Sequence, residues 1–163
     1  MKMKKWILFL VFAIFVSISY KTIFSLAQDT EDRQQIEKIL EKFLNSFVSN
    51  DFDSMMSQVS INYSDERDDK FIDYNMFKSI IKEGMDSFFK KYVNSSVSEL
   101  QIHSIEFKGD RAYVVLGFIR KSYNLETLRE ENWLQSILAI LVKEDGAWRI
   151  VTWKRLKPEE AIR

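Results

Sequence analysis

The side chains with the clearest capacity for acid–base chemistry surround His103, the only histidine in the sequence. Glu99 and Glu106 flank it, and a general base needs a titratable group held by an orienting partner. The neighbouring apolar residues follow a period of two that changes phase near His103 and Ser104, which predicts a strand with a bulge. Because no pair of base and orienting group can be assembled here, we interpret His103 as an outer-face strand residue and predict no catalytic residue.

A second group of titratable side chains falls within five residues, at Asp65, Glu66, Asp68 and Asp69. This run lacks the alternating ligand spacing and the turn glycine of a calcium loop. It therefore predicts a solvated loop within the segment from Ser60 to Asp73. The sequence has no cysteine, which excludes disulfides, thiolate zinc sites and a thiol nucleophile. With a single histidine as well, we predict no metal site and no cofactor.

Composition indicates one compact domain. The 163 residues include 14% aromatic side chains, one proline and four glycines, which is unlike a disordered chain or a flexible linker. Four lysines lie in residues 1–27, where there is no acidic residue. Without them, the 24 basic residues fall to 20 against 24 acidic ones, a net charge of −4. A mildly acidic domain without a basic stripe argues against a nucleic-acid partner.

Residues 1–27 have the three parts of an export signal. Basic residues at the start precede an apolar stretch from Trp6 to about Ser19, and Ser25-Leu26-Ala27 matches a cleavage site. The apolar run is shorter than the roughly 20 residues of a membrane-spanning helix. We expect a cleaved signal peptide and an exported domain, periplasmic or secreted, over residues 28–163. The alternative is an uncleaved anchor, in which residues 6–20 hold an outward-facing domain at the membrane.

Three stretches have the periodicity of amphipathic helices. The first runs from Asp32 to Ser49, and its apolar stripe is Ile36, Ile39, Leu40, Phe43, Leu44, Phe47 and Val48. A short helix is expected from Phe52 to Val59. The third begins near Tyr74 or Asn75, and its stripe is Phe77, Ile80, Ile81, Met85, Phe88 and Tyr92.

Strands follow the helices. After Asn94-Ser95-Ser96 the period becomes two, and a strand is expected through Phe107, then another from Arg111 to Tyr123. The stretch from Trp133 to Leu156 reads as one long hairpin turning at Glu144-Asp145-Gly146, since Asp-Gly between apolar runs is a strong hairpin signal. Its first arm ends in an unbroken apolar run, which is typical of a strand in the middle of a sheet. Helices followed by antiparallel strands predict an α+β fold.

The chain resembles the nuclear transport factor 2-like superfamily, which includes ketosteroid isomerase, scytalone dehydratase and polyketide cyclases. The resemblance covers about residues 30–157 and rests on three features in order. These are the long first helix followed by Asn50-Asp51-Phe52-Asp53, the turn Gly109-Asp110-Arg111-Ala112, and Lys143-Glu144-Asp145-Gly146-Ala147-Trp148-Arg149-Ile150. It implies a cone-like curved antiparallel sheet with the three helices on its concave face.

Enzymes of that superfamily resemble one another in placing an Asp or His base inside the cone. Many carry a histidine just after the Trp-Arg-Ile position, whereas this chain has Val151-Thr152-Trp153 there. The resemblance also suggests a ligand pocket at the open end of the cone. Arg120 extends the inward series that ends at Phe118, where it could meet an anionic ligand. The ligand-pocket candidates are Phe43, Phe47, Tyr63, Tyr74, Arg120 and Gln135.

Both faces of the predicted sheet are apolar, although three helices can cover only one. An uncovered apolar face of that size is unusual on a monomer, so we expect a homodimer formed through the outer face, as in dimers of the superfamily. The interface candidates are Tyr113, Val115, Ile119, Val151 and Trp153. The sequence thus favours an exported, non-catalytic domain that binds a small apolar ligand or a protein partner. The alternatives are a lyase or isomerase of the same fold and a membrane-anchored envelope assembly factor.

Overall fold

The computed structural model describes residues 29–67 and 70–157. The chain divides into two compact units, Met1–Gln35 and Ile36–Arg163. In the first, residues 29–35 are helical and Gln35 Nε2 donates a hydrogen bond to Glu31 Oε1 over 3.2 Å. The predicted signal or anchor in residues 1–27 lies outside the described residues. Within 29–67 and 70–157, no helix combines the length and the hydropathy needed to cross a membrane.

Among the residues that the structure describes, three helices precede the main sheet, as the periodicity predicts. Residues 29–48 are helical and are called the N-terminal helix here. Helix α2 spans Phe52–Met56 and α3 spans Tyr74–Lys91. Helix α2 is shorter than expected because residues 58–60 leave it to join the edge of β6 (Ala147–Arg155), where Ser60 N donates to Ile150 O and Ile150 N donates to Gln58 O, each over 2.9 Å.

The start of α2 gives the fold an acid-sensitive contact. Asp51 is the N-cap, and its Oδ1 accepts a hydrogen bond from Ser54 N over 3.0 Å. Hydrogen bonds from the Ser54 side chain and backbone lower the pKa of Asp51 below its ordinary value of 3.8. The unfolded chain therefore takes up the proton first, so this contact stabilises the fold above about pH 4 and is lost as the pH falls through the lowered pKa.

We expect Asp51→Asn to flatten the loss of stability as the pH falls below about pH 4, because asparagine caps a helix without a titrating charge. Urea unfolding of both proteins at intervals across this range measures the difference. Identical pH dependences would show that the Asp51 cap does not contribute to acid unfolding.

The segment between α2 and α3 differs from the expected solvated loop. It forms a two-stranded antiparallel hairpin, β1 (Ser64–Arg67) paired with β2 (Lys70–Asp73). Asp65 is 7% exposed, while Phe71 in β2 is 65% exposed. The prediction was wrong here because the acidic residues hide the short alternation around Ile72, which enters the core. No group of three or more potential metal ligands occurs in the described part of the chain.

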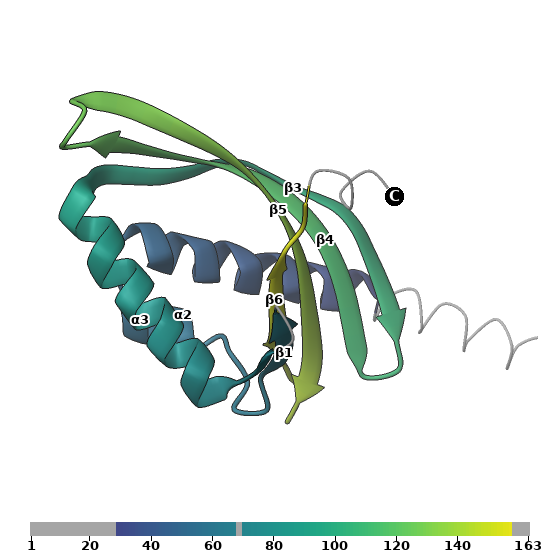
Figure 1. Ribbon diagram of the computed structural model, residues 1–163. Coiled ribbons are helices and arrows are strands. Elements are labelled where there is room, and N and C mark those ends of the chain that lie inside the picture. Colours follow the sequence, from purple (N-terminus) through teal and green to yellow (C-terminus); the bar gives the residue numbers. More distant parts are fainter. Residues whose placement is uncertain (1–28, 68–69, 158–163) are drawn as a thin grey trace, which may run out of the picture. The chain divides into compact units, whose positions relative to one another are not determined.

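The main sheet has four antiparallel strands in the order β3-β4-β5-β6. Strand β3 spans Tyr92–Lys108, β4 spans Arg111–Asn124 and β5 spans Arg129–Glu144. Figure 1 shows this sheet curving around the side on which α3 lies. The predicted α+β cone fold with a curved antiparallel sheet is confirmed, and the predicted bulge is present as a register shift between Ile102 and Ser104.

Two boundaries of the sheet differ from expectation. Strand β3 begins at Tyr92, directly after α3, and runs through Asn94-Ser95-Ser96, which the sequence indicated as a break. The pair β4 and β5 lies in the middle, whereas β6 is at the edge of the four strands. The β5–β6 turn is as predicted, since Asp145 has φ +49° and Gly146 has φ +82°. Positive φ at both central residues is the requirement of a type I′ turn.

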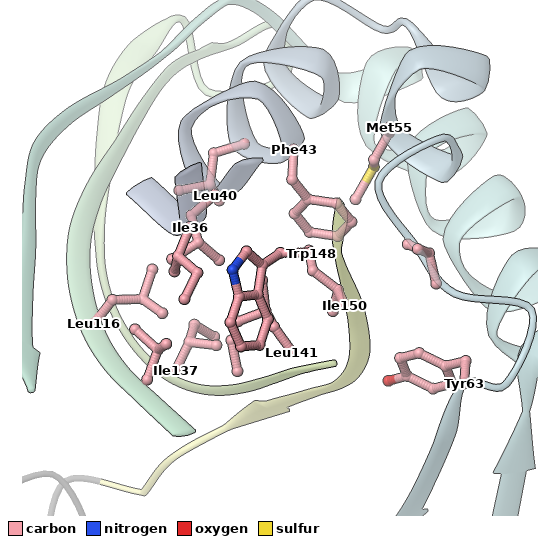
Figure 2. Close-up of a cluster of buried hydrophobic side chains, with 14 of the residues drawn as sticks. Ile36, Leu40, Phe43, Met55, Tyr63, Leu116, Ile137, Leu141, Trp148 and Ile150 are labelled. Carbon is pink, nitrogen blue, oxygen red and sulfur yellow. The ribbon is translucent and has the colours of Figure 1, made fainter. Parts of the chain in front are cut away.

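The core fills the space between the helices and the concave face of the sheet. Figure 2 shows Trp148 of β6 among side chains from the helix and from β4 and β5, including Ile36, Leu40 and Leu116. All three of these aliphatic residues are 0% exposed and Trp148 is 2% exposed. Phe43 packs against Trp153 with ring centroids 4.6 Å apart. This packing joins the N-terminal helix to the edge strand of the sheet.

A bulge in β6 decides which face Trp153 occupies. Ile140 pairs with Thr152 and Leu141 pairs with Ile150, so Val151 is an extra residue. One inserted residue reverses the facing of all residues beyond it. Trp153 therefore faces the core and contacts Phe43. Its predicted place on the outer face beside Val151 was wrong.

Candidate functional site

An aromatic cluster lies on the concave side of the sheet, and its side chains are only half-buried. It consists of Phe47 from the N-terminal helix, Phe88 from α3, Tyr92 at the start of β3 and Trp133 in β5. Phe88 stacks on Tyr92 with ring centroids 4.7 Å apart, and Tyr92 meets Trp133 edge-on at 5.2 Å. Phe47 lies 5.4 Å from Phe88. The cluster thus offers partly exposed ring surface beside the closed core.

The guanidinium of Arg120 lies among these rings. It is 4.5 Å from the centroid of Phe88, 4.7 Å from Trp133 and 5.5 Å from Phe47. The position follows from the period of β4, where Ala112, Val114, Leu116 and Phe118 are buried on the same face. Arg120 pairs with Trp133 across the β4–β5 ladder. Cations within about 6 Å of a ring face are attracted by its quadrupole, so the cluster stabilises this guanidinium.

Arg120 is a cation in a partly desolvated place. Burial is the main cause that lowers its pKa, and repulsion from Arg155 acts in the same direction. An arginine nonetheless stays protonated in proteins. Its Nε atom is buried and has no hydrogen-bond partner. The site therefore holds a fixed positive charge with hydrogen-bonding capacity left over.

A carboxylate lies on the same side of the sheet, at Glu131. Its Oε1 accepts a hydrogen bond from Asn124 Nδ2 over 2.6 Å, and its Oε2 accepts one from the Tyr92 hydroxyl over 3.3 Å. Sequence reasoning missed this group, because Asn124 to Glu131 looked like a polar connection rather than the ends of two strands. Extending the period of β5 back from Ile137 through Gln135 and Trp133 to Glu131 would have placed it inward.

The ligand-pocket candidates separate into two groups. The structure brings Phe47 and Arg120 together, as just described. Phe43 and Tyr63 are 1% and 2% exposed and belong to the core, where Tyr63 stacks on Phe77 at 4.0 Å and its hydroxyl accepts a hydrogen bond from Trp153 N. Tyr74 packs against the core from the first turn of α3, and Gln135 is a half-buried neighbour of Phe118 in the sheet.

His103 lies away from the aromatic cluster. It is exposed, and a Cβ placed on Gly117 would come within 2.8 Å of its Nε2 atom. Gly117 has the phase of Tyr113 and Val115 in β4, opposite to the core residues. The histidine thus covers the outer face of the sheet at a glycine, which leaves room for the ring. Neither Glu131 nor Arg120 shares that face.

The outer face keeps most of its predicted apolar residues. Tyr113, Val115 and Ile119 are half-buried, and Leu134 on the neighbouring strand is 73% exposed. Val151 is 8% exposed at the β6 bulge. It borders a pocket of about 370 Å³ that is lined by Asn62, Ser64, Arg111, Val142, Glu144, Val151 and Thr152. The pocket contains none of the ligand-pocket candidates.

The architecture can be compared with solved structures. A nuclear transport factor 2-like superfamily protein from Salmonella enterica superposes with a TM-score of 0.62 at 14% identity, covering 80% of this chain and 93% of that one. The chain therefore has a nuclear transport factor 2-like fold. A putative scytalone dehydratase from Novosphingobium aromaticivorans gives a TM-score of 0.61 at 13% identity, covering 79% and 87%.

A third protein with this nuclear transport factor 2-like fold is a ketosteroid isomerase-like protein from Erwinia carotovora atroseptica. Its TM-score is 0.58 at 15% identity, covering 77% of this chain and 96% of that one. Neither a protein-family model nor a curated protein matches the chain. At these identities the likeness establishes the fold alone, and the same fold supports unrelated functions.

Proposed function

We propose that this protein is an exported, non-catalytic binding domain that holds a small apolar ligand against the aromatic cluster. The observation that carries the proposal is the half-buried state of Phe47, Phe88, Tyr92 and Trp133 on the concave side. Ligand sites are mostly lined by apolar and aromatic side chains with few polar groups. These four rings, with Arg120 among them, match that description.

Export and dimer formation belong to the same proposal. The signal pattern of residues 1–27 agrees with a periplasmic or secreted protein. On the outer face, Val115, Ile119 and Leu134 present apolar surface, and a second copy of the chain about a twofold axis would cover it with the same residues. The partners proposed are thus a small ligand and a second copy, with no role for nucleic acid.

The alternative of a lyase or isomerase rests on Glu131. A carboxylate beside the Tyr92 hydroxyl has the components of a base and a proton donor. We favour binding because both Glu131 oxygens already accept hydrogen bonds. Glu131→Gln would abolish proton exchange in a bound carbonyl compound if the alternative held, and would leave ligand binding intact under the proposal.

The proposal can be tested with 2-naphthamide, a neutral aromatic probe, followed by NMR of the tryptophan indole signals. We expect the Trp133 signal, assigned with Trp133→Phe, to shift saturably while that of the buried Trp148 stays in place. Phe88→Ala should weaken binding about two- to tenfold, since an aromatic pair contributes about 0.5–1.5 kcal/mol beyond its buried area. Absence of any saturable shift at Trp133 would contradict the proposed binding site.

A further inference from the structure

Among the described residues, Arg120 has three aromatic neighbours but no anionic partner, and this combination points to a ligand group. Three rings surround the guanidinium at 4.5, 4.7 and 5.5 Å. Within residues 29–67 and 70–157, Arg120 makes no ion pair with a carboxylate, and its Nε donates no hydrogen bond. Partly buried arginines usually bind a carboxylate or a phosphate. Here the rings compensate part of the desolvation, and the hydrogen-bonding capacity stays open.

The individual nitrogen atoms show where an acceptor would bind. Nε is buried without a partner, which is costly for a charged donor. Because Nε is the buried, unpaired nitrogen of Arg120 among the described residues, an acceptor would approach the guanidinium through its two terminal NH₂ groups. A guanidinium offers its donors in a planar fork that fits the two oxygens of a carboxylate.

A second cation adds to the positive charge near this site. Arg155 in β6 pairs with Ile137 of β5 and repels Arg120. Ile137 and Trp133 have the same, inward-facing phase in β5. Arg155 pairs with the first and Arg120 with the second, so each arginine pairs with an inward-facing residue of that strand. Repulsion between two cations is relieved when an anion binds near them.

We propose that the ligand carries a carboxylate, which binds the guanidinium fork of Arg120 while its apolar body packs on the aromatic cluster. This inference rests on the proposed binding function and specifies its ligand class. Glu131, which has the same phase in β5 as Trp133, accepts hydrogen bonds from Asn124 and Tyr92 instead of from Arg120. The anion that Arg120 lacks would thus come from the ligand.

The test compares 2-naphthoate with 2-naphthamide, which have nearly the same shape and differ in charge. We expect the purified protein to bind 2-naphthoate about 10- to 100-fold more tightly, the value of one charge-assisted hydrogen-bonded contact. The Arg120 Nε–H signal in NMR spectra should shift with 2-naphthoate and much less with 2-naphthamide. Isothermal titration calorimetry provides the dissociation constants.

Variants separate the role of the charge from that of the fold. Arg120→Gln should bring the two affinities together, and Lys121→Gln, which removes a neighbouring positive charge from the opposite face of β4, should preserve the preference. Equal affinities of the unmodified protein for both probes would overturn this inference and leave the proposed function standing. Failure of both probes to bind would overturn the proposed function as well.

Discussion

Phe43→Ala is expected to lower the free energy of unfolding by about 3–5 kcal/mol, the usual cost of truncating a buried phenylalanine. Phe43 is 1% exposed, and its ring contacts Trp153 at 4.6 Å. The truncation would leave a cavity between the N-terminal helix and the edge strand β6, which can close only if one of them moves. Urea unfolding monitored by tryptophan fluorescence measures the loss.

Phe71→Ala is the matched control for this experiment. Its ring is 65% exposed on β2, so the same truncation should change the free energy of unfolding by no more than about 0.5 kcal/mol. If both variants lost similar stability, Phe43 would not be part of the principal core, and the packing of the helix on the sheet would be wrong.

Val115→Glu is expected to yield a folded monomer. Val115 lies half-buried on the outer face of β4, and a twofold interface would bury the new charge twice. Because an unpaired buried charge costs several kcal/mol, the dimer dissociation constant should rise by about 100-fold or more. Sedimentation velocity gives the oligomeric state, and far-ultraviolet circular dichroism reports the fold.

Two further variants make this prediction specific. Leu128→Glu places the same charge on a leucine that is 68% exposed between β4 and β5, and it should remain a dimer. Trp153→Glu should lose about 3 kcal/mol or more of stability, since Trp153 packs on Phe43 in the core. An unmodified protein that sediments as a monomer at micromolar concentration would contradict the proposed interface.

Sequence patterns were sufficient to predict features that depend on local backbone conformation and on the periodicity of apolar residues. Asp145 and Gly146 form the predicted hairpin turn because both adopt positive φ. The stripe that includes Ile36, Leu40 and Phe43 is the buried face of the N-terminal helix. Strict alternation along β4 predicted which of its residues face the core. The same alternation predicted that Arg120 faces the concave side.

The predictions were wrong where contacts between residues far apart in the sequence determine the structure. Trp153 changes face because one extra residue, Val151, is inserted against β5, and no local pattern marks that insertion. The hairpin of β1 and β2 forms beside β6, where the Thr152 hydroxyl donates to Ser64 O over 2.6 Å. The sequence of this segment did not indicate the contact, because Ser64 and Thr152 are far apart in the chain.

The candidate site was partly accessible to sequence reasoning. Phe47 and Arg120 were predicted as pocket residues, and they lie 5.5 Å apart as measured from the guanidinium to the ring. Tyr63 was placed with them, but it stacks on Phe77 inside the core. Trp133 reaches the site because it pairs with Arg120 between β4 and β5. The sequence did not predict this pairing, because Asn124 to Glu131 was interpreted as a polar connection and not as the ends of these two strands.

Native mass spectrometry of the purified protein tests the central claim most directly, because one spectrum reports both the assembly and any bound molecule. We expect a dimer that takes up one 2-naphthoate per chain, with uptake lost in a Phe88→Ala and Arg120→Gln double variant. A protein that binds no 2-naphthoate, or whose uptake is the same in that variant, would contradict it.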